Sequence, residues 1–235
     1  MSFRRLSALA AVCLAFVGAP ALAASPTVPP RDTMAQRMQA CVVCHGEEGR
    51  ATNDGYFPRI AGKPAGYLYN QLLNFRDGRR ISPTMTTLVE HLSDTYLREI
   101  ADYFAALELP YPPPRPTDAP AALLARGAAL VVHGDARREL PACSECHGSR
   151  MTGVMPAVPG LLGLPQDYLA AQLGAWRSGA RRAHAPDCMG AIAQRLDAAD
   201  VVAVTTWLAA QALPVDPMPA PAPSTLPPDC GSGFE

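Results

Sequence analysis

Two short motifs in the chain combine a pair of thiols with an imidazole at a fixed spacing. Each has the form C-x-x-C-H, and they occupy residues 41–45 and 143–147. Two thiols one helical turn apart can add to the two vinyl groups of one porphyrin, and the histidine that follows then lies under the iron. The motifs therefore predict two covalently bound haem c groups. The predicted attachment points are Cys41, Cys44, Cys143 and Cys146, with His45 and His147 as proximal iron ligands.

Other chemistry is compatible with paired cysteines but fits this pattern less well. Structural zinc needs a second pair of ligands near each motif, and neither copy supplies one. A thioredoxin-like redox pair requires a βαβ context, which the sequence lacks. Simple disulfides would leave the repeated histidine unexplained. Haem attachment is the interpretation that uses every residue of both motifs.

The motifs belong to a long internal repeat. Eight residues of the segment 62–78 recur as identical residues 101 positions later. These pairs are Gly62/Gly163, Pro64/Pro165, Tyr67/Tyr168, Leu68/Leu169, Gln71/Gln172, Leu72/Leu173, Arg76/Arg177 and Gly78/Gly179, and Phe75 is matched by Trp176. Eight identities at one offset predict two copies of one structural unit.

The elements expected in each copy are helices. Apolar residues fall at helical spacing over residues 97–107 and 201–208, each run following a polar capping residue, and no pair of alternating strands is apparent. Further helices are expected at 33–44, 67–75, 121–132 and 168–176. The predicted class is all-α: two tandem helical domains (residues 25–108 and 121–214) joined by a semi-rigid proline-rich linker, 109–120. A proline-rich tail, 215–235, is expected to lie extended over the surface.

Residues 1–24 resemble an export signal. Two arginines precede an apolar run, and the A-L-A at 21–23 suits cleavage, which would also remove Cys13. The prediction is a periplasmic protein, soluble or peripherally membrane-associated, with the uncleaved signal as an anchor as the alternative. No later run has the roughly 18 apolar residues that span a bilayer. A formal charge of −1 gives no reason to expect a nucleic-acid partner.

With these motifs in view, residues 30–214 resemble two tandem class I cytochrome c domains, the arrangement of the dihaem cytochrome c4 family. The matching features are C-x-x-C-H-G, a P-x-x-x-G-x-P-x-x-Y-L-x-x-Q-L-x-x-[FW]-R-x-G segment, a downstream methionine, and a closing helix with an aromatic residue at Tyr103 or Trp207. The resemblance implies a mainly helical fold and an electron shuttle between membrane respiratory complexes. The proline-rich tail and two cysteines, Cys188 and Cys230, depart from the pattern.

The resemblance also places an axial methionine between the arginine-rich segment and the closing helix. Met85 stands there 40 residues after His45, and Met189 stands there 42 residues after His147. Competing candidates are His91, His184, Met151 and Met155. Ligation by histidine and methionine fills both axial positions and raises the reduction potential, which favours electron transfer over catalysis.

Other site residues follow from the same comparison. Pro58 and Pro159 match the family proline whose carbonyl accepts the N–H of the proximal histidine. A further set is expected to reach the haem propionates or the domain interface: Tyr67, Gln71, Arg76, Tyr168, Gln172 and Arg177. For Tyr67 and Tyr168 the alternative is ordinary packing on a helix face. The pairs Arg79/Arg80 and Arg181/Arg182 are expected to form a solvated basic patch that would steer an acidic partner.

Cysteine parity predicts one disulfide. Of seven cysteines, Cys13 leaves with the signal and four hold haem, so Cys188 and Cys230 remain as a pair in an oxidising compartment. Their bond would tie the tail across the distal loop of the second haem, beside Met189. The alternative is that Cys230 pairs with another chain.

The predicted function is electron transfer between respiratory donors and acceptors, with redox proteins as partners and no small-molecule substrate. One alternative is a cytochrome subunit docked on a dehydrogenase or terminal oxidase. A dihaem peroxidase is a less favoured alternative, because it needs an iron that can lose its distal ligand.

Overall fold

The fold was analysed in a computed structural model that describes residues 32–52, 56–114, 116–222 and 230–232. The chain separates into two units, residues 1–32 and 33–235, and the account below concerns the second. The predicted signal segment, 1–24, lies outside the described residues. None of the described helices is long and apolar enough to cross a membrane.

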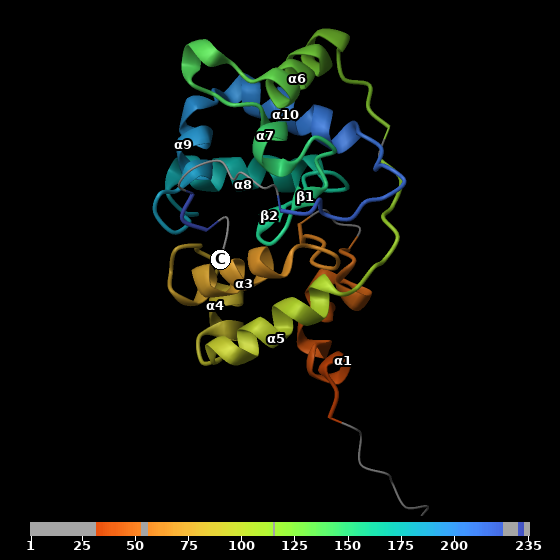
Figure 1. Cartoon of the computed structure of the whole chain (residues 1–235), viewed down its shortest axis with the longest axis vertical. Helices are drawn as coiled ribbons and strands as arrows, with labels where there is room; N and C mark the ends of the chain where they lie inside the picture. The colour runs from red at the N-terminus through yellow and green to blue at the C-terminus, as the bar shows by residue number, and fades with distance from the viewer. Residues whose placement is uncertain (1–31, 53–55, 115, 223–229, 233–235) are drawn as a thin grey trace, which may run out of the picture. The chain divides into compact units, whose positions relative to one another are not determined.

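The first repeat consists of short helices around one apolar core (Figure 1). They are α1 (Met34–Arg37), α2 (Gln39–His45), the 3₁₀ turn η1 (Glu47–Gly49), α3 (Ala65–Arg76), α4 (Pro83–Val89) and α5 (Asp94–Ala105). Side chains of Thr33, Ser82 and Ser93 cap α1, α4 and α5. The helix expected over 33–44 is interrupted at Met38, where ψ is near 0° and the side chain is buried against Cys41.

The second repeat has longer terminal helices. Its elements are α6 (Ala121–His133), the 3₁₀ turn η2 (Ala136–Arg138), α7 (Cys143–His147), α8 (Gln166–Ser178), α9 (Cys188–Arg195) and α10 (Ala198–Ala210). Helices α6 and α10 pack directly on each other, as Figure 1 shows. They meet at Gly127, where a Cβ would lie 2.2 Å from the carbonyl oxygen of Ala203. Only glycine permits this close approach.

A buried carboxylate joins the same two helices. Asp200 on α10 is 3% exposed and accepts hydrogen bonds from Arg126 Nε at 3.0 Å and Arg138 Nη1 at 2.6 Å. Burial by itself would raise the pKa of Asp200, but the hydrogen bonds from Arg138 and Arg126 outweigh it, so the pKa is lowered. The ionised carboxylate is therefore part of the folded second repeat.

Each repeat has its own hydrophobic cluster. The first is built around Leu97 and Phe104 of α5, and the second around Leu130 of α6 and Leu208 of α10. The two clusters share no residues, as two tandem helical units require. The proline-rich linker is held by Arg59, which is buried, stacks on the ring of Tyr111 at 3.9 Å and donates to carbonyl oxygens of residues 109 and 110.

A small strand pair was not predicted. Strands β1 (Gly153–Val154) and β2 (Val158–Pro159) form a two-stranded antiparallel ladder after the second motif. The tail adds to it, because Ala220 accepts from Met155 N at 2.8 Å and donates to Gly153 O at 2.9 Å. Part of the tail is thus hydrogen-bonded to the second repeat rather than only lying over its surface. Segments this short carry too few alternating residues to be recognised from the sequence.

Candidate functional site

The cysteines of both motifs line one large apolar cavity. Cys41 and Cys44 lie on α2, Cys143 and Cys146 lie on α7, and all four are free thiols. The cavity has a volume of about 1180 Å³, and residues of both repeats line it. Burial raises the pKa of Cys143 to about 11 and also raises that of Cys41. Burial therefore favours the protonated form of Cys143 and Cys41, and both thiols line the cavity.

The motif histidines are oriented identically in the two repeats. His45 Nδ1 lies 2.9 Å from the carbonyl oxygen of Pro58, and His147 Nδ1 lies 2.7 Å from that of Pro159. Each carbonyl accepts the Nδ1 proton, which leaves Nε2 free to bind a metal. Burial lowers the pKa of both imidazoles, so they are neutral, as a ligand must be. The hydrogen bonds predicted for the two prolines are present.

Met85 and Met189 lie on the wall of the same cavity. Met85 is in the first turn of α4, where Ser82 caps the helix and accepts from Met85 N at 3.5 Å. Met189 is in the first turn of α9, which Asp187 caps. Both methionines therefore occupy rigid helix starts on the cavity wall.

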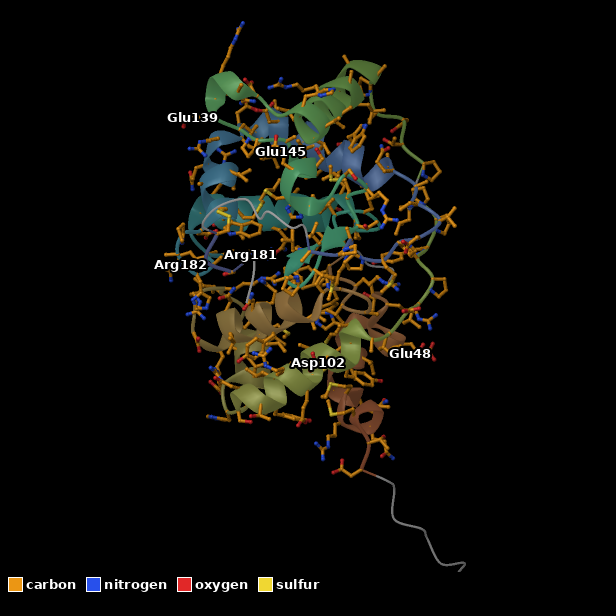
Figure 2. The ribbon with its side chains drawn as sticks, viewed as in Figure 1. Glu48, Asp102, Glu139, Glu145, Arg181 and Arg182 are labelled. Atoms are coloured by element: carbon orange, nitrogen blue, oxygen red, sulfur yellow. A yellow bond between two sulfur atoms is a disulfide. The ribbon has the colours of Figure 1, made fainter. Side chains whose placement is uncertain are left out.

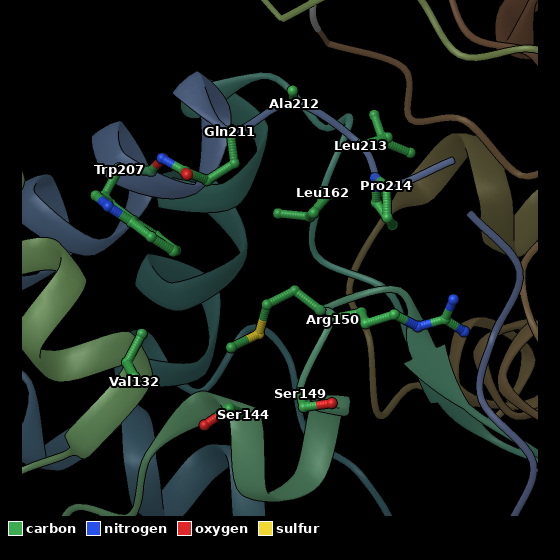
Figure 3. A pocket seen from close by; sticks show the side chains of 11 residues that line it. Val132, Ser144, Ser149, Arg150, Leu162, Trp207, Gln211, Ala212, Leu213 and Pro214 are labelled. Atoms are coloured by element: carbon green, nitrogen blue, oxygen red, sulfur yellow. The ribbon is translucent and has the colours of Figure 1, made fainter. Parts of the chain in front are cut away.

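The competing ligand candidates are placed elsewhere. His91 and His184 are exposed, Met155 is 39% exposed, and none of the three lines the cavity. Met151 is buried, but it lines a smaller pocket of about 390 Å³ together with Trp207 and Arg150 (Figure 3). These placements favour Met85 and Met189 as the distal residues.

The interface between the repeats contains two crossed arginines. Arg80 donates to Gln71 Oε1 of its own repeat at 3.0 Å and to Gln172 Oε1 of the other at 2.7 Å. Arg181 mirrors it, donating to Gln172 Oε1 at 2.8 Å and to Gln71 Oε1 at 3.0 Å. The arrangement follows the internal repeat and fixes one unit against the other.

Tyrosines and aromatic rings complete this interface. The hydroxyl of Tyr67 accepts from Arg181 and that of Tyr168 accepts from Arg80, both at 3.4 Å. Burial opposes ionisation of Tyr67, but the charges of Arg181 and Arg80 outweigh it and lower its pKa. Arg181 also stacks on Trp176 at 3.8 Å. The two tyrosines and the glutamines therefore reach the domain interface, one of the two roles predicted for them.

The prediction of a solvated basic patch is wrong for Arg80 and Arg181. The segments pair as a short antiparallel bridge, with Ile81 N donating to Ala180 O at 2.8 Å and Arg182 N donating to Arg79 O at 2.7 Å. Alternation along extended backbone turns Arg80 and Arg181 inward, and Arg181 is 5% exposed. Figure 2 shows Arg181 within the fold and Arg182 at its edge.

Arg76 and Arg177 also differ from their predicted role. Neither lines the cavity. Arg76 donates to Leu92 O at 3.2 Å and to Asp94 at 2.6 Å, and Arg177 donates to Leu196 O at 2.8 Å. Their guanidinium groups tie α3 and α8 to the start of the closing helix in each repeat, so these contacts replace the expected haem contact.

Several polar groups on the cavity wall fit the carboxylates of a haem. Within the described residues, Arg80 and Arg181 form no ion pair with a protein carboxylate, and Trp176 Nε1 is buried with no hydrogen-bond partner. Burial lowers the pKa of Arg181, and the charge of Arg80 adds to this, so an anion nearby would relieve both effects. Haem propionates supply such anions, and the thiols, imidazoles and thioethers described above suit the remainder of the group.

The remaining two cysteines form the predicted disulfide, Cys188–Cys230. It joins the tail to the first residue of α9, directly before Met189. Beyond it, Ser232 Oγ accepts from His184 N at 3.0 Å, and Ser232 O accepts from Asn70 Nδ2 at 2.9 Å. The end of the tail therefore contacts both repeats, and Cys230 and Ser232 are part of the cavity wall.

Two helical repeats, each with its own attachment motif on a shared apolar cavity, define the class of dihaem c-type cytochromes. Comparison with known proteins agrees. The chain is 36% identical over 211 residues to the thiosulfate dehydrogenase electron acceptor of Thiomonas intermedia, covering 89% of this chain and 92% of the relative. It is 34% identical to cytochrome c4 of Pseudomonas aeruginosa, covering 72% and 82%. The chain belongs to the cytochrome c4 family and carries two covalently bound haem c groups.

Solved structures agree with this assignment. Reduced cytochrome c4 from Pseudomonas stutzeri matches with a TM-score of 0.65 at 28% identity, covering 75% of this chain and 95% of that one. Thiosulfate dehydrogenase from Marichromatium purpuratum matches with a TM-score of 0.66 at 35% identity, covering 75% of this chain. This chain spans only 39% of the latter's length. No family model matches the chain. The fold is two cytochrome c domains, and the protein is an electron-transfer cytochrome.

Proposed function

We propose that this protein is a periplasmic carrier of single electrons with one histidine- and methionine-ligated haem in each repeat. The proposed residues are Cys41, Cys44, His45 and Met85 for the first haem, and Cys143, Cys146, His147 and Met189 for the second. Bound there, each haem would cycle between ferric and ferrous iron. The observation that carries the proposal is that both complete ligand sets line one cavity.

The same ligand sets argue for a carrier rather than an enzyme. A peroxidase needs one iron with an open distal position and acid–base groups beside it. Here both distal positions are supplied by a methionine at a capped helix start, and the second is also held by the disulfide at Cys188. The crossed arginines of the interface would keep the two haems in a fixed relation, which suits electron exchange between them.

A thiosulfate-oxidising dehydrogenase is the proposed electron donor. Support comes from a relative named as an electron acceptor of thiosulfate dehydrogenase, which this chain matches over nearly its whole length. A second candidate, a unit docked permanently on such an enzyme, is favoured by the match to part of a longer thiosulfate dehydrogenase chain. The periplasmic location rests on the signal-like residues 1–24, and the domain boundaries at 25–108 and 121–214 rest on the repeat.

The test is reduction of the purified holoprotein by thiosulfate dehydrogenase and thiosulfate, followed in the visible haem bands by stopped flow. We expect reduction of both haems only when enzyme and thiosulfate are both present. Omitting either one is the control, and dithionite then defines full reduction. A holoprotein that dithionite reduces fully but the dehydrogenase does not would contradict the proposed donor.

A further inference from the structure

The chain contains a single lysine, Lys63, among twenty basic residues. It lies between the repeated glycine and proline that precede α3, and it is 5% exposed. A lysine is usually found on the surface, because removing its ammonium group from water is costly. The burial of the only lysine therefore calls for an explanation in the chemistry of its surroundings.

The side chain of Lys63 crosses to the other repeat. Its Nζ donates to the carbonyl oxygen of Gly160 at 3.2 Å and lies 5.9 Å from the ring centre of Tyr111. It forms no ion pair with a carboxylate in the described part of the chain. Gly160 directly follows Pro159, whose carbonyl holds the imidazole of His147. A positive charge from the first repeat is thus held at the proximal side of the second haem site.

The two proximal sides carry different cations. At the first site the residue after Pro58 is Arg59, whose buried guanidinium stacks on Tyr111 and donates to the linker carbonyls of residues 109 and 110. The residue that matches Lys63 in the second repeat is Leu164, so the first haem site receives no ammonium group from its neighbour. Arg80 and Arg181, in contrast, occur as a matched pair, one from each repeat.

We propose that Lys63 acts through its charge to raise the reduction potential of the second haem. The inference rests on the proposed haem ligands. Oxidation removes one electron from the iron and adds one positive charge to the site, and a fixed cation in a poorly solvated wall disfavours that gain. No bond changes, and the electron that leaves or reaches the iron is exchanged with the redox partner.

Lys63→Met tests the proposal in the holoprotein, since methionine keeps the length of the side chain and removes its charge. Lys63→Arg keeps the charge, and Leu164→Met is the matched neutral change in the other repeat. The measurement is a spectroelectrochemical titration that resolves two one-electron waves. The wave that Met189→Ala displaces is assigned to the second haem.

We expect Lys63→Met to lower the reduction potential of the second haem by about 59 mV, which for one electron is a roughly tenfold change in its ferrous-to-ferric ratio. The wave of the first haem should stay in place. Lys63→Arg and Leu164→Met should leave both waves near their original positions. The proposal is overturned if Lys63→Met moves neither wave, if it moves both equally, or if Lys63→Arg moves the second wave as far as Lys63→Met does.

A failure of the proposed function gives a different result. In that case the mass of the wild-type protein would include fewer than two haems, or its near-infrared spectrum would lack the methionine-to-iron charge-transfer band. A wild-type protein with both haems and both bands isolates the role of Lys63. Lys63→Gln serves as a second neutral variant if the methionine variant does not accumulate.

Discussion

Cys230→Ser removes the covalent link between the tail and the helix start that carries Met189. Cys188 and Cys230 are 42 residues apart in the chain, and closing a loop of that length is worth about 4 kcal/mol in the chain-entropy model, with measured values of roughly 2–4. The hydrogen bonds of Ser232 remain, but each contributes only about 1 kcal/mol. These figures refer to release of the whole loop, so they set the upper range of the shift expected for opening the second distal loop, roughly 30- to 700-fold.

The assay is titration of the oxidised holoprotein with imidazole, which competes with methionine for iron. Loss of the methionine-to-iron charge-transfer band should occur at lower imidazole concentration for the second haem of Cys230→Ser and at unchanged concentration for the first. Ser232→Ala, which loses one hydrogen bond and keeps the disulfide, is the matched control. Equal sensitivity of both haems, or no change at either, would refute the claim that the disulfide secures Met189.

Three further predictions concern ligands and packing. Met85→Ala and Met189→Ala should each abolish one charge-transfer band and lower one haem potential without releasing haem, as redox titration and mass spectrometry will show. Gly127→Ala should cost about 1–3 kcal/mol of unfolding free energy because its Cβ meets backbone, whereas Gly174→Ala, with nothing within 4 Å, should be neutral or slightly stabilising in urea melts. Asp200→Asn should cost about 1–3 kcal/mol at neutral pH. Since the folded pKa of Asp200 is lowered, that difference should shrink as the pH falls below about 3.9 towards the folded value.

The helical framework was predictable from the sequence because its signals are local. Capping residues such as Ser93 and Asp197 precede runs with helical spacing, and both produce helices that begin at the next residue. The disulfide was predictable from the cysteine count alone, because two cysteines remain once the signal segment and the two haem motifs are accounted for. The interruption at Met38 was not, because methionine favours helices and the side chain is instead buried in the core of the first repeat.

The inward-facing arginines Arg80 and Arg181 were the part of the interface that sequence reasoning missed. A run of two arginines is most often a solvated surface, and nothing local distinguishes Arg80 from Arg79. The distinction arises only when the segment pairs with its copy 101 residues later, which turns one arginine of each pair inward. The signal that could have identified it is the repeat itself, because both pairs follow the recurring glycines Gly78 and Gly179.

The burial of Lys63 was also not predictable from the residues around it in the sequence. Its burial depends on the approach of the loop at Gly160 from the other repeat, 97 residues away. Its rarity, by contrast, is visible in the sequence, and a sole lysine at a position where the other copy has Leu164 marks an asymmetry between two otherwise similar units.

The intact mass of the exported protein under denaturing conditions tests the central claim most directly, because thioether-bound haem survives denaturation whereas coordinated haem is lost. The account predicts a mass that exceeds the signal-free polypeptide by two haems, with one haem on each peptide that contains a C-x-x-C-H motif after proteolysis. A mass with one haem or none, or two haems that map to other peptides, would contradict it.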